Sequence, residues 1–176
     1  MLRRSAIRSS IYSLAAAMSL LAAVPALAGP PWISIEVPPN PYDRATRGAF
    51  LVVHAFHHGN AMEFPVRGTA EGLVGGRRRS VQLTFDKTAR QGSYALRKQW
   101  PTDGTWMLVI SVEPGGENNR ATALVELSPA GEVASVRVPS EERNGYTVPR
   151  QVTSREIETT LQANAAATRV AGRTGR

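Results

Sequence analysis

The chain of 176 residues contains no cysteine. This absence excludes disulfide bonds, a thiol nucleophile, thiolate ligands for a metal and a lipid-modified amino-terminal cysteine. An oxidising compartment permits disulfides but does not require them, so the absence does not argue against export. Any metal site in this protein must use nitrogen, oxygen or thioether ligands.

Several catalytic signatures are also missing. No G-x-S-x-G elbow presents a serine, and no sequence context links a serine to a histidine. Gly75-Gly76 lacks the spacing of a phosphate-binding loop, and Glu141-Glu142 is interpreted as part of a loop rather than as an acid/base pair. We therefore expect a binding protein rather than an enzyme. An exported hydrolase is an alternative that requires a serine or carboxylate to converge on His54.

A strong positive charge is missing from the body of the chain, although the whole sequence has a formal net charge of +7. Residues 1–28 contain three arginines and no acid, and residues 150–176 contain five arginines and two glutamates. Residues 29–149 contain 13 basic and 12 acidic residues. The globular part is nearly neutral, so the sequence does not favour a nucleic acid as partner.

The one long apolar run comes first and predicts an export signal. Arginines open the chain, residues 11–26 are rich in Ala and Leu, and Ala26-Leu27-Ala28 is a small-x-small cleavage motif. The alternative, a retained membrane anchor, needs about 20 uninterrupted apolar residues, and Pro25 interrupts this run. We expect cleavage before Gly29, no stable membrane insertion afterwards, and a periplasmic or secreted location.

From Trp32 onward, short segments with alternating apolar residues are separated by Gly, Pro and Asn, which is typical of an antiparallel all-β domain. Regular spacing favours an immunoglobulin-like antiparallel β-sandwich of seven or eight strands over residues 29–139, with a small closed barrel as the alternative. Strands are predicted at 32–37, 49–56, 64–74, 79–86, 92–99, 105–112, 121–127 and 132–138.

Two segments indicate how strands face the core. Within residues 79–85, Val81, Leu83 and Phe85 alternate with polar residues, so one face is expected to be buried. Residues 105–112 are apolar at nearly every position, which favours a central strand covered on both faces. The residues expected in the sandwich core are Trp106, Leu108, Ile110 and Val112.

The remaining segment, residues 140–176, lacks the alternating apolar pattern of the preceding strands. Residues 140–151 contain few apolar side chains and are interpreted as a linker. Ser154 predicts the N-cap of a short helix, but its apolar stripe is thin, so this helix is expected to be marginal. The stripe consists of Ile157, Leu161 and Ala165.

Residues 171–176 are expected to be a disordered basic end. Removing residues 150–176 is then expected to leave the thermal transition almost unchanged. Residues 150–176 are interpreted as a flexible or partner-ordered arm.

All three histidines lie in His54-Ala55-Phe56-His57-His58, and Met62 follows. A strand running to His58 places His54 and His58 on one face, whereas a turn beginning at His57 allows His57 and His58 to meet. Neutral imidazoles suit Cu(II), Zn(II) or Ni(II), and thioethers suit Cu(I). The candidate copper or zinc ligands are therefore His54, His57, His58 and Met62. The alternative is a strand end in which His54 packs or hydrogen-bonds while the other two lie in a solvated turn.

The usual amino-terminal copper motif is absent from the predicted mature chain. Gly29-Pro30-Pro31 has no histidine in third place, and proline has no amide proton for a metal to displace.

Gly92-Ser93-Tyr94, followed by Trp100 and by residues 103–110, resembles the ending of small exported immunoglobulin-like domains of the YtkA-like group. The resemblance covers residues 33–112 and implies that Tyr94 and Trp106 fill the core between the sheets. Because members of that group are often associated with exported metal or respiratory-complex handling, the resemblance also adds some support to the copper alternative. The chain differs from the group in its further strands and basic segment after Val112.

These patterns together favour an exported, non-enzymatic binding module for an unidentified protein partner. A periplasmic copper or zinc protein is the first alternative, and an exported hydrolase is the second.

Overall fold

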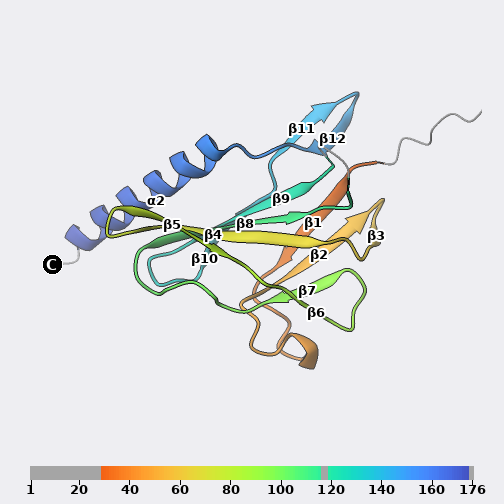
Figure 1. The fold of residues 1–176 in the computed structure, drawn as a ribbon, viewed down its shortest axis with the longest axis horizontal. Helices are drawn as coiled ribbons and strands as arrows, with labels where there is room; N and C mark the ends of the chain where they lie inside the picture. The colour runs from red at the N-terminus through yellow and green to blue at the C-terminus, as the bar shows by residue number, and fades with distance from the viewer. Residues whose placement is uncertain (1–28, 116–118, 175–176) are drawn as a thin grey trace, which may run out of the picture.

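The computed structural model describes residues 29–115 and 119–174, with side chains described up to residue 167. Two five-stranded antiparallel sheets pack against each other, and a two-stranded sheet and an α-helix flank them (Figure 1). The prediction of an all-β antiparallel sandwich with a C-terminal helix is confirmed. The predicted export signal, residues 1–28, lies outside the described residues.

The first sheet has the order β1-β2-β7-β6, and β3 also pairs with β2. Because β1 and β2 are antiparallel, with Pro31 opposite His57, the start of β1 lies beside the end of β2. The residues just before β1 therefore lie next to the histidine cluster. The strands of this sheet are β1 (Pro31–Glu36), β2 (Leu51–His57), β3 (Asn60–Ala61), β6 (Asp86–Lys87) and β7 (Ser93–Leu96).

The second sheet has the order β10-β9-β8-β4-β5. Its strands are β4 (Val66–Val74), β5 (Arg77–Gln82), β8 (Thr105–Val112), β9 (Ala121–Leu127) and β10 (Val133–Arg137). Each of the eight predicted segments overlaps one of the strands β1, β2, β4, β5, β7, β8, β9 and β10. The described residues add four strands to the predicted set, namely the two-residue strands β3 and β6 and the pair β11 and β12.

The core lies between the two sheets and includes the residues that the sequence predicts. Trp106, Leu108, Ile110 and Val112 are at most 4% exposed, and Leu83 is buried with Val81 and Phe85 packed against it. The Trp106 ring lies against Gly72, where a Cβ would come within 2.5 Å of it. Its Nε1 donates to the carbonyl of Asp103 at 2.7 Å, so the buried indole is fully satisfied.

Helix α2, Ser154–Thr174, covers the outer face of β8, which explains why that strand is apolar on both faces. Leu161 is completely buried and packs with Met107 and Leu124. The interpretation of this helix as having little to bury is therefore wrong. The helix also reaches Thr174, so residues 171–174 are helical rather than disordered, and 175–176 lie outside the described residues.

The interpretation of residues 140–151 as a linker without regular structure is wrong for residues 140–149, which form two strands. Strands β11 (Ser140–Arg143) and β12 (Tyr146–Pro149) form a hairpin. Asn144 and Gly145, with φ of +53° and +79°, supply the two left-handed residues that a tight hairpin turn requires.

The hairpin is joined to the first turn of α2 by charged and capping contacts. Arg150 makes two hydrogen bonds of 3.0 Å to the Glu156 carboxylate, and this guanidinium lowers the pKa of Glu156. Thr153 Oγ1 accepts from the N–H of Glu156 at 3.2 Å, so the cap lies one residue before the predicted Ser154.

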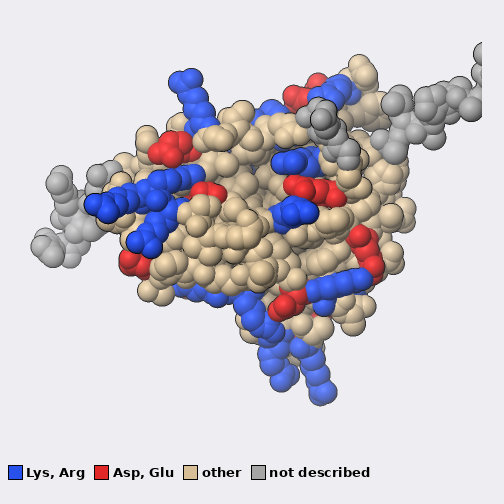
Figure 2. Space-filling model, in the orientation of Figure 1, with Lys and Arg blue, Asp and Glu red and all other residues tan. Residues whose placement is uncertain are grey.

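On the face shown in Figure 2, Lys and Arg side chains lie among Asp and Glu side chains over much of the surface. Arg78 illustrates the pattern, because it contacts Glu71 on β4 at 3.0 Å and Glu158 on α2 at 3.3 Å. The described part of the chain contains no helix that is long and apolar enough to span a bilayer.

Candidate functional site

The histidine cluster is divided by the geometry of β2 and its turn. His54 and His57 belong to β2 and, being three residues apart, point to opposite faces of the sheet. His58 has φ of +50° and, with Gly59 at +78°, forms the turn into β3. This left-handed residue leaves the alternation of the strand, so the rings of His57 and His58 lie 4.3 Å apart between centroids.

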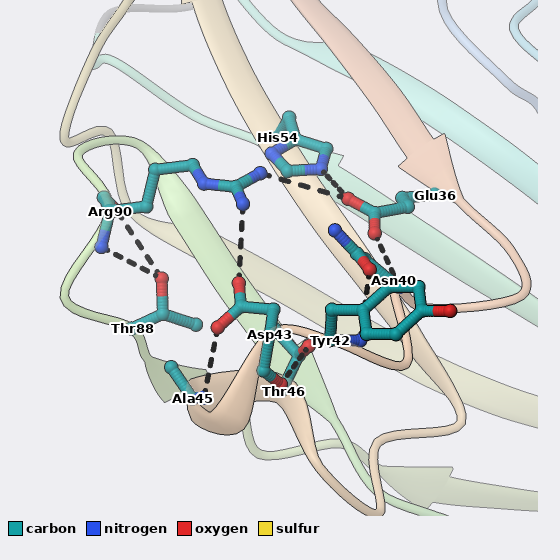
Figure 3. Close-up of polar contacts among 9 residues, drawn as sticks. All are labelled: Glu36, Asn40, Tyr42, Asp43, Ala45, Thr46, His54, Thr88 and Arg90. Carbon is teal, nitrogen blue, oxygen red and sulfur yellow. Dashed lines mark hydrogen bonds and ion pairs between the residues drawn. The ribbon is translucent and has the colours of Figure 1, made fainter.

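His54 belongs to a polar network on one edge of the sandwich (Figure 3). Its Nε2 lies 2.8 Å from Glu36 Oε2, while Glu36 Oε1 accepts from the N–H of Asn40 at 2.8 Å. Arg90 lies 3.9 Å from the Glu36 carboxylate and 3.2 Å from that of Asp43.

This network holds the loop between β1 and β2. Asp43 accepts from the N–H of Ala45 at 2.9 Å and so caps the short 3₁₀-helix Arg44–Thr46. The hydrogen bond from Asn40, and then that from His54, lowers the pKa of Glu36, whereas burial opposes them. An ionised Glu36 thus connects β1, β2 and the loop.

Replacing Glu36 by glutamine is expected to lower the free energy of unfolding by about 1 kcal/mol at pH 7, since partly exposed charge-assisted hydrogen bonds are lost. A lowered folded pKa gives stability that is complete above the ordinary value of 4.5 and disappears as pH falls through the folded value. The difference between wild type and Glu36→Gln should therefore shrink below pH 4.5 in urea titrations at several pH values.

Glu132→Gln is the matched control, because Glu132 is exposed and lies outside this network. Its effect should stay within about 0.5 kcal/mol at every pH. An equal pH dependence for the two variants would contradict the assignment to Glu36.

The hydrolase alternative gains a carboxylate but no nucleophile at His54. Glu36 converges on the imidazole, as that alternative requires, but it also binds the loop backbone. Within the described residues, no hydroxyl group is hydrogen-bonded to the His54 ring. A shallow hollow of about 400 Å³ beside it is lined by His54, Phe56, Ala61, Arg90, Gln91 and Gly92. The contacts of His54 and Glu36 fix the loop between β1 and β2.

His57 and His58 both bind Gly29, the residue predicted to begin the mature chain. The N–H of Gly29 donates to His58 Nε2 at 3.1 Å, and His57 Nε2 donates to the Gly29 carbonyl at 2.7 Å. A Cβ on Gly29 would come within 2.7 Å of His58 Cε1. Only a glycine fits this close approach without displacing the ring.

The four residues predicted as metal ligands therefore do not form one site. His54 is bound to Glu36 on the opposite face. Met62 follows β3, where its N–H donates to the Ala55 carbonyl at 2.9 Å. In residues 29–115 and 119–174, no three His, Asp or Glu side chains are grouped to hold a metal. Sequence reasoning missed Gly29 because only the pairing of β1 with β2 brings it to the histidines; the predicted cleavage site was the one signal that pointed to this residue.

A larger cleft, of about 1090 Å³, lies between the β11–β12 hairpin and the residues before β1. Its rim includes Tyr146, whose side chain is 74% exposed. The cleft is lined by Gly29, Pro30, Pro31, His58, Asn119, Arg120, Glu141, Arg143, Asn144 and residues 146–151. Sequence reasoning missed it because the hairpin was interpreted as a linker, although Asn144-Gly145 is a strong hairpin signal.

Comparisons with models of known families, with curated proteins and with solved structures found no match to this chain.

Proposed function

We propose that this chain is an exported, non-enzymatic β-sandwich that binds an extended segment of a protein partner in the cleft beside the β11–β12 hairpin. The observation that carries the proposal is the cleft itself, which is lined by residues of both hairpin strands and has an exposed tyrosine on its rim. A partly exposed tyrosine is a favoured anchor in protein interfaces.

The hairpin offers the chemistry for strand addition. Within the described residues it is a two-stranded sheet, so the outer edge of β12 pairs with no third strand. An extended peptide can use such an edge through its main-chain hydrogen bonds, with side-chain contacts providing specificity. The Tyr146 ring supplies apolar area next to this edge.

The charges of the cleft favour a polypeptide over a nucleic acid. Arg120 contacts Glu113 at 3.4 Å, Arg143 contacts Glu141, and Arg150 contacts Glu156. Each arginine is thus already paired within the protein, and the surrounding body is nearly neutral. Binding to a phosphate backbone depends on unneutralised basic groups.

The amino-terminal pattern supports export. A basic start, an apolar run and a small-x-small motif end at residue 28, and the protein partner is expected in the periplasm or outside the cell. The resemblance of residues 92–110 to YtkA-like domains remains consistent with this location.

Photo-crosslinking in cells that export the full-length chain tests the proposal. A photo-crosslinking residue at position 147, in the cleft, is expected to form a discrete adduct with one protein, whereas the same residue at position 42 is not. Tyr146→Ala should reduce that adduct by about tenfold or more, as loss of an interface anchor does.

Tyr42→Ala is the matched control, since Tyr42 is 92% exposed and does not line the cleft. Both alanine variants should melt within a few degrees of wild type. Equal adducts from positions 147 and 42, or none from 147, would overturn the proposal.

A further inference from the structure

We propose that the processed chain binds one Cu(II) ion at its amino terminus, through the α-amino nitrogen and carbonyl oxygen of Gly29 and the Nε2 atoms of His57 and His58. This inference rests on the part of the proposed function in which residues 1–28 are removed. It keeps two of the four ligands that the sequence suggests, His57 and His58, and adds Gly29.

Strand pairing brings these donor atoms together. Pro31 on β1 lies opposite His57 on β2, so the two residues before Pro31 reach the end of β2. The turn conformation of His58 then places its ring beside that of His57, 4.3 Å away between centroids. Both imidazoles direct Nε2 to Gly29.

The observed separations suit a shared ion. With metal–nitrogen bonds of about 2.0 Å, neighbouring donors stand about 2.8 Å apart in a square plane and about 3.3 Å apart in a tetrahedron. Gly29 N and His58 Nε2 are 3.1 Å apart, and Gly29 O and His57 Nε2 are 2.7 Å apart. An ion can therefore replace the two hydrogen bonds with small movements of the rings.

Cleavage creates the first ligand. In the unprocessed chain Gly29 N is an amide nitrogen, which donates its proton and offers no lone pair to a metal. After cleavage it is a primary amine, which becomes a donor when it releases its extra proton to solvent. Because Gly29 has no side chain, the amine reaches the His58 ring where a Cβ would collide at 2.7 Å.

Pro30 determines how the amine chelates. Cu(II) at a free amino terminus often displaces the next amide proton, but Pro30 has none. The remaining partner on the same residue is the Gly29 carbonyl oxygen, which closes a five-membered ring with the amine. Three nitrogen donors and one oxygen donor in a tetragonal arrangement favour Cu(II), which also binds such sites more tightly than Zn(II).

The test begins with protein exported from the full-length sequence and purified after processing. Amino-terminal sequencing should find Gly29 first, and calorimetric titration should find one Cu(II) per chain. Electron paramagnetic resonance should show nitrogen coupling from this ion. Zn(II) should bind more weakly to the same protein.

Three histidine substitutions and one change at the amino terminus test which groups bind the ion. His57→Ala, His58→Ala and a processed chain acetylated at the Gly29 amine should each bind Cu(II) at least about 10–100-fold more weakly, the loss that even an outer partner of a metal ligand causes. His54→Ala is the matched control and should bind within about twofold of wild type, since its ring lies on the opposite face. Thermal melts without copper check that each protein is folded.

Each outcome bears on a definite part of the proposal. Equal affinity in the chain acetylated at the Gly29 amine, or in His57→Ala and His58→Ala, would overturn the amino-terminal site. A chain that begins at Gly29 but binds no Cu(II) would overturn this inference and leave the binding cleft unaffected. A different first residue would overturn both the predicted cleavage and the copper site.

Discussion

Leu161→Ala is expected to lower the free energy of unfolding by about 2–5 kcal/mol, the range for removing a fully buried leucine side chain. Leu161 is 0% exposed and fills the space between α2 and the outer face of the second sheet, against Met107 and Leu124. Its loss leaves a cavity and uncovers the outer face of β8. Thermal and urea unfolding of the processed chain measure the effect, at about 2–4 °C in Tm for each kcal/mol.

Thr159→Ala is the matched control on the same helix. Thr159 is exposed, and alanine is the better helix former, so the change should stay within about 0.5 kcal/mol. Ending the chain after Arg150 should destabilise the protein at least as much as Leu161→Ala. An unchanged Tm after this truncation would show that α2 does not stabilise the sandwich and is an independent arm.

Gly92→Ala is expected to destabilise the protein by about 2–4 kcal/mol through backbone strain and overlap. Gly92 has φ of +64°, and a Cβ there would lie 2.8 Å from main-chain atoms of Ala55 and Met62. These atoms belong to the β2–β3 turn region, where the Ala55 N–H donates to the Gly92 carbonyl at 2.8 Å. No side-chain rotation relieves the overlap, so the sheet itself must move.

Gly48→Ala separates the cost of the left-handed backbone from the cost of the steric overlap. Gly48 has φ of +77° but open space where a Cβ would be, so alanine there costs only the left-handed backbone, about 1–2 kcal/mol. The difference between the two variants in urea unfolding measures the overlap at Gly92. Equal losses of unfolding free energy in the two variants would show that the chain around Gly92 accommodates the added methyl group without a further cost.

The strands of the two main sheets were predictable because each has a strong local pattern. Val81, Leu83 and Phe85 alternate with polar residues, and the structure buries that side. The continuous apolar run of β8 predicted cover on both faces, and the structure supplies it from the first sheet and from α2. The alternation of apolar and polar residues indicates which face of a strand packs against an apolar partner.

The hairpin and the helix contact were harder to predict because little of either is buried. Strands β11 and β12 have no buried residue, so they carry no apolar alternation, and only Asn144-Gly145 marked the turn. Among the side chains of α2 described up to residue 167, Leu161 is the one that is fully buried against the sheet. A thin apolar stripe is sufficient to attach the helix to the sheet because the surface that it meets, Met107 and Leu124, is already apolar.

The sequence left open whether His57 and His58 meet, and the structure decides it through the left-handed backbone of His58. That conformation is uncommon outside glycine and is not evident from the residue type alone. The position of Gly29 likewise depends on β1 pairing with β2, which joins residues 28 or 29 positions apart. Local patterns do not report such a contact.

By itself, the sequence determined the strand segments, the apolar faces, the turn residues and the export pattern, because each of these depends on neighbouring residues. Only the tertiary structure decided that α2 covers β8, that a hairpin borders a cleft, and that His54 is separated from His57 and His58. These features arise where distant segments pack together, and their free energy resides in contacts that no single segment contains.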